Sequence, residues 1–412
     1  MGRDTGFMEI GRQMAARRSV DDRVKDWFQV YKEPSDSLVQ GQGERCMDCG
    51  IPFCHTGCPL GNIIPDWNDL VYRNRWKEAI KVLHKTNNFP EFTGWVCPAP
   101  CEAACVLGIN DDPVTIKQIE LRTIDHAFQE GWIKAEPPKV RTNKKVAIVG
   151  SGPSGLACAA QLNRAGHWVT VFERADRIGG LLTYGIPDFK MEKYHIDRRI
   201  AQMKSEGVSF KINVHVGKNF SETQLLKRFD AIVLACGSEE PRDLPVSGRN
   251  LDGVYFAMDF LTQQNKRMEG CKITDSDSIL ANGKHVVVID DSLVRGTSSK
   301  AIIKALRRSG ARKISMLITY PPIKFPCYAG IDFPSQEELA TFTQGKEYSD
   351  NEIIEKVRND IGADFLGYND AENLANAVGI PLDSMCFTCT SGNYEPLGIK
   401  PEFKTREQLK GD

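Results

Sequence analysis

The 412-residue sequence contains no apolar run that approaches the length of a membrane-spanning helix, about 18 residues or more. Its start, MGRDTGFMEIGRQMAARR, lacks the apolar stretch of a secretory signal peptide. Neither sign of charge is in excess, because 53 Lys and Arg residues are balanced by 54 Asp and Glu residues. Composition therefore indicates neither a nucleic-acid nor a membrane partner, and we expect a cytoplasmic protein with small-molecule chemistry.

The chain has no repeat of fixed period, but it is rich in cysteine. Seven of its thirteen cysteines lie between Cys46 and Cys105, spaced Cys46-x2-Cys49-x4-Cys54-x3-Cys58 and Cys97-x3-Cys101-x3-Cys105. In a reducing compartment, clustered cysteines more often bind metal or carry out redox chemistry than form disulfides. Short spacings of this kind bring thiolates together around an iron–sulfur cubane. The pattern predicts two 4Fe-4S clusters within residues 1 to about 130.

Two four-iron clusters require eight ligands, one more than the cysteines supply. Glu120 follows Cys105 on an expected helix and could add a carboxylate oxygen. The rival interpretation is structural zinc, which also uses Cys-x2-Cys pairs. Seven thiolates fit two zinc sites poorly unless His55 joins them, and we otherwise expect His55 to be a bystander.

Patterns of apolar and turn-forming residues divide the chain into three parts. Short helical stretches, such as Trp67 to Leu83, predict a small helical domain over residues 1–142, ending in the polar, Pro-containing linker Lys134 to Lys145. From Lys145, strands VAIVG, WVTVF and AIVLACG alternate with turn and helix signals, as in a parallel α/β sheet over residues 143–283. Residues 284–412 open with another apolar strand, HVVVI, then a helix around Ala301 to Arg308 and a strand, ISMLIT.

The segment VAIVGSGPSG places Gly150, Gly152 and Gly155 between the first of these strands and a helix, with Glu173 at the end of the next strand. Such glycines permit a tight turn and close approach of a pyrophosphate to the helix N-terminus, and the carboxylate can bind ribose hydroxyls. A purely structural Gly-rich turn is the alternative. Because the whole strand–turn–helix–strand–acid unit is present, we predict dinucleotide binding; Cys158 on that helix is expected to be a packed residue.

The cysteine segments CMDCGIPFCHTGCPLGNIIPDWNDLV and GWVCPAPCEAAC, with VTIKQIE after them, resemble the small subunit of NADPH-dependent glutamate synthase, whose N-terminal domain also occurs in dihydropyrimidine dehydrogenase. GGLLTYGIPDFKMEK resembles the FAD site of the same subunit, so the resemblance runs to about residue 283. It implies a Rossmann-like FAD domain and two interleaved ligand sets. One set is Cys46, Cys49, Cys54 and Cys105, and the other is Cys58, Cys97, Cys101 and Glu120.

Beyond that point the pattern changes, because HVVVI is followed by two carboxylates and not by a second GxGxxG. Carboxylates at a strand end can bind ribose, and a loop before a helix can hold a 5′-phosphate. VVVIDDSLVRGTSS resembles the phosphoribosyl pyrophosphate (PRPP) motif. PPIKFPCYAGIDFPSQEELA and CFTCTSGNYEP resemble the C-terminal part of amidophosphoribosyltransferase. This implies a partial transferase domain binding Mg²⁺-PRPP through Asp290, Asp291, Arg295, Gly296, Thr297 and Ser298, with Cys327, Cys386 and Cys389 as cluster ligands; a solvated turn is the alternative for the two aspartates.

Three functions remain open from the sequence. The first is an α/β electron-transfer flavoprotein with an N-terminal helical iron–sulfur domain, passing electrons between FAD and two clusters to the large subunit of glutamate synthase. The second is a PRPP-binding protein derived from amidophosphoribosyltransferase. The third is a recombined chain that completes neither reaction. Because the second nucleotide loop is missing, we expect FAD to bind weakly and NADPH to reduce it poorly.

Overall fold

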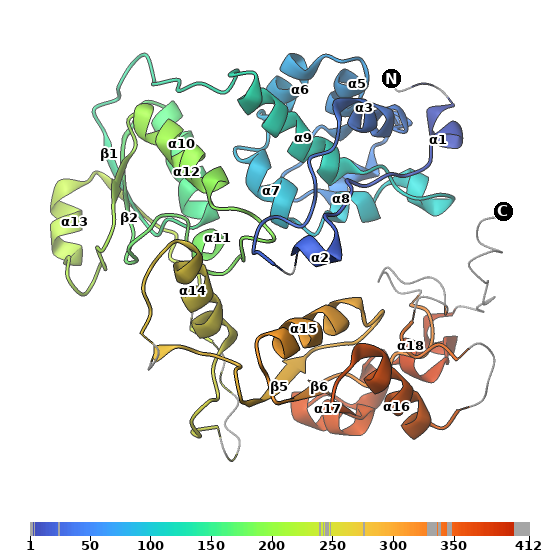
Figure 1. Ribbon diagram of the computed structural model, residues 1–412. Helices are drawn as coiled ribbons and strands as arrows, with labels where there is room; N and C mark the ends of the chain where they lie inside the picture. Colours follow the sequence, from blue (N-terminus) through green and yellow to red (C-terminus); the bar gives the residue numbers. More distant parts are fainter. Residues whose placement is uncertain are drawn as a thin grey trace. The chain divides into compact units, whose positions relative to one another are not determined.

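The computed structural model describes residues 3, 5–23, 25–238, 240–241, 243, 247, 249–274, 277–327, 336, 339–343 and 348–398, without the side chains of residues 20, 21 and 298. Within it the chain forms two compact units, Met1–Ser278 and Ile279–Asp412 (Figure 1). Half of the motif PPIKFPCYAGIDFPSQEELA, residues 328–335 and 337–338, lies outside the described residues, as does the side chain of Ser298.

The first unit begins with a helical part that carries the seven clustered cysteines. Its helices are α1 (Gly6–Glu9), α2 (Val20–Arg23), α3 (Asp36–Glu44), α4 (Phe53–Gly57), α5 (Ile64–Tyr72), α6 (Trp76–Leu83), α7 (Pro90–Val96), α8 (Pro100–Ala103), a 3₁₀ turn (Val106–Ile109) and α9 (Ile116–Gln129). Apolar side chains at helical spacing on α5, α6 and α9, among them Trp67, Leu83 and Ile119, are fully buried in one core. Five of the seven cysteines belong to this core or pack against it: Cys46, Cys54, Cys58, Cys101 and Cys105.

The stretch Trp67 to Leu83, predicted as one helical segment, is divided between α5 and α6. The chain turns at Asn74, which has a positive φ of 59°. Its side chain accepts a hydrogen bond from the Trp76 indole N–H at 2.9 Å. Asn tolerates the left-handed region better than most residues, so a single side chain ends one helix and orients the next.

The α/β part of the same unit is a parallel sheet in the order β3-β2-β1-β4. Its elements are β1 (Lys145–Val149), α10 (Pro153–Arg164), β2 (Trp168–Phe172), α11 (Leu181–Tyr184), α12 (Tyr194–Ser205), β3 (Ser209–Lys211), α13 (Glu222–Arg228), β4 (Ala231–Leu234) and α14 (Ala257–Met268). Phe89 and Phe92 of the helical part share one hydrophobic core with Ile148, Val169 and Leu156. The iron–sulfur and α/β parts are therefore packed together as one unit.

The buried ion pair between Glu91 and Arg199 joins the same two parts. Glu91 lies on α7 and is fully buried, and Arg199 of α12 donates to both its carboxylate oxygens, at 2.6 and 2.9 Å. A bidentate pair of this kind fixes the angle between two elements, because both partners would be left uncompensated if the helices moved apart.

The second unit contains a three-stranded parallel sheet in the order β5-β6-β7. The elements are β5 (His285–Asp290), α15 (Thr297–Arg308), β6 (Lys313–Ile318), α16 (Asp350–Ile361), β7 (Phe365–Tyr368), α17 (Ala371–Val378), a 3₁₀ turn (Leu382–Ser384), α18 (Thr388–Ser391) and a second 3₁₀ turn (Glu395–Leu397). Residues such as Ile314, Met316 and Leu366 form the core with α15 and α16. None of the helices in the described part of the chain is long and apolar enough to span a membrane.

Candidate cofactor sites

Four of the predicted cysteine ligands line one cavity in the helical part of the first unit. They are Cys46, Cys49, Cys54 and Cys105, and the cavity encloses about 360 Å³ including its open mouth. Asp48, at a positive φ of 48°, turns the chain tightly between the first two. Cys105 comes from a segment far along the chain. The fold, and not the short spacing of the first three cysteines, brings it to this cavity.

Burial raises the pKa of the thiols of Cys46, Cys49 and Cys54, in the last case to about 12. Negative charge on Cys105 raises all three further. Cysteine binds metal as the thiolate, and burial disfavours that charged form. Four thiolates are therefore stable in this cavity only when positive charge among them compensates for burial. The arrangement fits the prediction of a metal cluster held by these four residues.

Asn68 on α5 lines the same cavity and was not foreseen from the sequence. It is fully buried, and neither polar atom of its amide has a hydrogen bond of normal geometry within the described part of the chain. The amide nevertheless lies close enough to Cys46 to oppose the burial-driven rise in the pKa of that thiol. A buried amide without partners is costly unless something in the cavity accepts its hydrogen, as sulfur in a cluster would.

The remaining predicted ligands, Cys58, Cys97, Cys101 and Glu120, form a second group. Burial raises the pKa of the Cys101 thiol, and negative charges on Glu102, Cys58, Glu120 and Cys97 raise it further. Gly57 makes this meeting possible, because a Cβ there would lie 2.5 Å from the Cβ of Ala104. The glycine lets α4 approach α8. Cys58, which directly follows α4, therefore lies beside α8, the helix that carries Cys101.

Glu120 lies on α9 as predicted, and only 6% of it is exposed. Burial raises the pKa of its carboxyl group to about 7, although the Thr93 hydroxyl, which donates to Oε1, opposes the rise. The amide of Asn87 also donates to Oε1, at 3.2 Å. A carboxyl group buried beside three cysteines is suited to bind a cation through its other oxygen.

Among the residues described, no three His, Cys, Asp or Glu side chains converge on a point as ligands of one metal ion would. His55, the residue that a zinc interpretation needs, accepts a hydrogen bond through Nε2 from the backbone N–H of Ile64 at 3.0 Å. Ile64 is the first residue of α5, so the imidazole satisfies one of the free amides at the start of that helix. This contact gives His55 a structural role at the start of α5, and the expectation that it is not a ligand stays a prediction.

The predicted dinucleotide loop joins β1 to α10, and its three glycines differ in what surrounds them. A Cβ on Gly150, whose φ is 107°, would lie 2.2 Å from the carbonyl oxygen of Ala235, and one on Gly155 would lie 2.1 Å from that of Gly150. A Cβ on Gly152 would meet nothing within 4 Å. The first and third glycines are therefore required by packing, whereas the second leaves the loop open on the side of a pocket that a pyrophosphate could approach.

Glu173 follows β2 and lines that pocket, where 7% of it is exposed. Its carboxylate accepts hydrogen bonds from the Ser151 amide at 3.1 Å, the Ser151 hydroxyl at 2.5 Å and the Ala175 amide at 2.8 Å. Gly180, Leu181 and Leu182, from the motif GGLLTYGIPDFKMEK, line the same pocket, and Gly180 lies against the backbone of Gly152. Cys158 packs against the neighbouring core, in agreement with the expected packing role.

In the second unit, Asp290 ends β5 and Asp291 follows it, with Gly296 at a φ of 70° immediately before α15. Burial, reinforced by Asp291, raises the pKa of the Asp290 carboxyl group. Arg295 is exposed on the loop, and Thr297 is exposed at the start of α15. The predicted acid pair and the predicted loop therefore lie together at the carboxyl end of a parallel strand, the edge at which α/β sheets bind ligands.

Cys327, Cys386 and Cys389 also lie close together in the second unit. Burial raises the pKa of the Cys389 thiol, and negative charge on Cys327 and Cys386 adds to the effect. A hydrogen bond with Thr388 lowers the pKa of the Cys386 thiol. The structure thus brings together three residues that are separated by up to 62 positions in the sequence.

Comparisons with known proteins identify two domains of the first unit and the family of the chain. Residues 23–132 match the family described as dihydropyrimidine dehydrogenase domain II, 4Fe-4S cluster, and residues 148–205 match the NAD(P)-binding Rossmann-like domain. The glutamate synthase [NADPH] small chain of Bacillus subtilis is 48% identical over 361 residues, which cover 85% of this chain and 72% of that protein. This chain belongs to the family of glutamate synthase small chains. The predicted iron–sulfur domain and Rossmann-like domain are confirmed.

The small chain of Mycobacterium tuberculosis H37Rv is 57% identical over 310 residues, covering 74% of this chain but 63% of its relative. The protein therefore spans less than two thirds of the length of that small chain. Coverage of 85% of the 412 residues amounts to about 350 residues, so the alignment with the B. subtilis small chain continues past residue 283. The glutamine PRPP amidotransferase of B. subtilis has a TM-score of 0.25 at 21% identity, covering 61% of this chain and 38% of that one, a likeness too weak to establish a shared fold.

Proposed function

We propose that this glutamate synthase small-chain relative is an iron–sulfur flavoprotein that transfers electrons between FAD and two 4Fe-4S clusters. The observation that carries the proposal is that Cys46, Cys49, Cys54 and Cys105 line one cavity, with a second thiol–carboxylate group in the same unit. The Rossmann-like loop belongs to that unit too. Clusters and flavin packed in one compact unit favour electron exchange between them.

In this proposal Cys46, Cys49, Cys54 and Cys105 hold one cluster, and Cys58, Cys97, Cys101 and Glu120 hold the other. Such clusters supply one-electron transfer at potentials set by charge, hydrogen bonds and solvent exposure. Gly150, Gly152, Gly155 and Glu173 hold the pyrophosphate and ribose of FAD. Burial of the thiols, the buried Asn68 amide beside Cys46 and the open side of Gly152 support the fit of these groups.

Elemental analysis of anaerobically purified protein tests the cluster assignment. We expect about eight iron atoms per chain, from two four-iron clusters. Cys49→Ala should lower this to about four, whereas Cys158→Ala, a matched change outside both groups, should leave it unchanged. Zinc in place of iron, or full iron content in Cys49→Ala, would refute the assignment.

We also propose that FAD binds weakly and that NADPH reduces it poorly, since the second nucleotide loop is replaced by Asp290, Asp291 and the residues after them. Anaerobic mixing with NADPH, followed through the visible flavin absorption, tests this. Rapid bleaching of the flavin would contradict it. The electron acceptor in this proposal is a glutamate synthase large subunit, and thiolate ligands are consistent with a location in the reducing cytoplasm.

A second candidate function belongs to the second unit. Asp290 and Asp291 at the end of β5, followed by a loop that enters α15, would hold the ribose and 5′-phosphate of Mg²⁺-PRPP, with Arg295, Gly296, Thr297 and Ser298 around the phosphate. Cys327, Cys386 and Cys389 would be three ligands of a further cluster. On this proposal residues 1–142, 143–283 and 284–412 are the iron–sulfur, FAD and transferase-like domains.

Calorimetry in Mg²⁺ buffer tests PRPP binding. Weak binding that falls further in Asp290→Asn and Asp291→Asn, but not in Asp383→Asn from the same unit, is the expected result. Pyrophosphate release dependent on glutamine or ammonia would contradict the further expectation that no amine transfer occurs.

A further inference from the structure

Two polar side chains outside α9 bind one oxygen of the Glu120 carboxylate. Thr93 lies on α7, and Asn87 lies in the segment just before that helix; both donate to Oε1 of Glu120. In the described part of the chain, Oε2 of Glu120 accepts no hydrogen bond. The protein therefore occupies one oxygen of this proposed ligand and leaves the other oxygen for iron.

The orientation of the Asn87 amide is fixed by a backbone group. Its Oδ1 accepts a hydrogen bond from the backbone N–H of Phe89 at 3.0 Å, so the NH2 group of the same amide points the other way. This NH2 group donates to the hydroxyl oxygen of Thr93 at 2.8 Å and to Oε1 of Glu120 at 3.2 Å. Because only 3% of Asn87 is exposed, water has little access to these contacts.

The hydroxyl group of Thr93 has one hydrogen and three possible acceptors. The carbonyl oxygens of Phe89 and Pro90 both lie 3.4 Å away, which is longer than a usual O–H···O hydrogen bond. Oε1 of Glu120 is closer, and a charged acceptor makes the stronger bond. Since the hydroxyl oxygen accepts from Asn87 while its hydrogen goes to Glu120, the two hydrogen bonds strengthen each other.

Close packing of α7 on α9 brings Thr93 within reach of Glu120. Gly94 follows Thr93, and a Cβ on Gly94 would lie 2.8 Å from the Cβ of Leu121, the residue after Glu120. A larger residue at this position would push the two helices apart. The glycine thus allows the hydroxyl of one helix to contact the carboxylate of the other.

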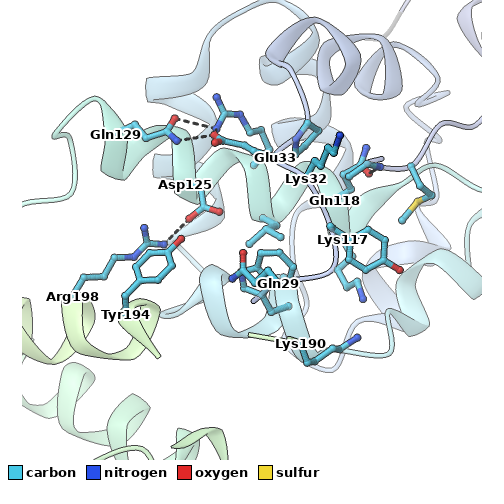
Figure 2. Close-up of a pocket in the computed structure, with 18 residues that line it drawn as sticks. Gln29, Lys32, Glu33, Lys117, Gln118, Asp125, Gln129, Lys190, Tyr194 and Arg198 are labelled. Carbon is cyan, nitrogen blue, oxygen red and sulfur yellow. Dashed lines mark hydrogen bonds and ion pairs between the residues drawn. The ribbon is translucent and has the colours of Figure 1, made fainter. Parts of the chain in front are cut away.

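Lys117 lies one turn before Glu120 on α9, but its ammonium group is bound elsewhere. It is one of the residues that line the pocket in Figure 2, and it donates to the carbonyl oxygen of Cys97 at 3.1 Å. Its positive charge lowers the pKa of the Glu120 carboxyl group, yet within the described residues the two groups form neither a hydrogen bond nor an ion pair. The direct contacts to the carboxylate come from Asn87 and Thr93.

We propose that Thr93, oriented by Asn87, is a positioning residue of the second cluster, the one that Glu120 would bind. The Thr93 hydroxyl holds Oε1 of Glu120, so that Oε2 is the ligand atom, and it withdraws negative charge from the carboxylate. A carboxylate that donates less charge to iron stabilises the oxidised cluster less, so the hydrogen bond raises the reduction potential. This inference rests on the proposed function, because it requires Glu120 to be a ligand.

Thr93→Val removes the hydroxyl group and keeps the shape of the side chain, whereas Thr93→Ser keeps the hydroxyl group. A redox titration of the anaerobically purified full chain, followed by electron paramagnetic resonance, measures the potential of each cluster. We expect Thr93→Val to shift the reduction equilibrium of the second cluster roughly tenfold toward the oxidised form, which lowers its potential by about 59 mV for one electron. Thr93→Ser should retain the wild-type potential.

Thr123→Val is the matched control, because Thr123 is fully buried on the same helix as Glu120 and its hydroxyl donates to the carbonyl oxygen of Ile119 at 2.7 Å. This substitution should change neither potential. Asn87→Ala removes the longer hydrogen bond and should shift the second cluster in the same direction as Thr93→Val, but only by roughly threefold. Asn87→Ala provides the test if Thr93→Val does not retain the second cluster.

The signal that remains in Cys49→Ala identifies the second cluster. If wild-type protein contains both clusters and the potential of the second is the same in Thr93→Val, Asn87→Ala and the control, the inference fails while the proposed function stands. Equal shifts of both clusters would also overturn the inference, because they would indicate a change in the whole domain. If wild-type protein contains no iron, the proposed function fails and the inference fails with it.

Discussion

The chain contains two strand–loop–helix units that differ in how tightly they are built. Between β1 and α10, Gly150 and Gly155 are required because any Cβ would lie 2.2 Å or less from a backbone oxygen. Between β5 and α15, a Cβ on Gly296 would lie 3.4 Å from its nearest neighbour, and only its φ of 70° favours glycine. The first loop is fixed by packing at its first and third glycines, and the second is fixed mainly by its own backbone conformation.

The strands that lead into the two loops also differ in burial, and the first is again the more tightly packed. Ala147 and Ile148 in β1 are fully buried, whereas 52% of Val287 and 68% of Ile289 in β5 are exposed. Parallel sheets are normally covered on both faces, and β1 follows this rule while one face of β5 does not. A ligand site at the end of β1 therefore lies on a strand that is packed on both faces, whereas a site at the end of β5 lies on a strand that is packed on one face.

The largest effect that this comparison predicts is in the first loop. Gly155→Ala places a Cβ 2.1 Å from a backbone oxygen and should lower the free energy of unfolding by about 3 kcal/mol or more. Gly152→Ala has open space around it, so its unfolding free energy should change by less than about 1 kcal/mol while FAD affinity falls. Chemical denaturation and flavin titration measure the two quantities. Equal destabilisation by both substitutions would mean that the glycines do not have the separate roles described.

A smaller effect is expected in the second loop. Gly296→Ala should cost about 1–2 kcal/mol, the penalty of a left-handed conformation for a residue with a Cβ. Gly296→Asn should recover much of that loss, because Asn tolerates this region. Denaturation of the second unit provides the measurement. A loss as large as that of Gly155→Ala, without recovery by Asn, would show that the loop is as tightly packed as the first.

Local patterns predicted more of the first unit than of the second. Cysteine spacing and the Gly150–Gly155 loop each lie within a short stretch of sequence, and the structure places both as expected. The pairing of Cys105 with Cys46 came from family resemblance, because sequence spacing does not determine which distant segments pack together. The place of Asn68 in the cavity was not predicted from the sequence, because a polar residue in an otherwise apolar helix can face either solvent or a cofactor.

The buried ion pair between α7 and α12 illustrates the same limit. Glu91 and Arg199 lie 108 positions apart, and each resembles an ordinary surface residue in the sequence. Their pairing joins α12 to α7 and appears only in the folded chain. Long-range contacts of this kind depend on the whole fold, so they cannot be predicted from residue spacing.

The smallest predicted effect tests whether the exposed face of β5 is free. Ile289→Thr should change the free energy of unfolding by no more than about 0.5 kcal/mol, because 68% of Ile289 is exposed and Thr suits a strand. The matched substitution Ile148→Thr, at a fully buried position of β1, should cost several times as much, because it buries a hydroxyl in an apolar core. Both values come from chemical denaturation of the full chain. If the two substitutions were equally destabilising, the exposed face of β5 would be covered in solution, and the contrast between the two sheets would disappear.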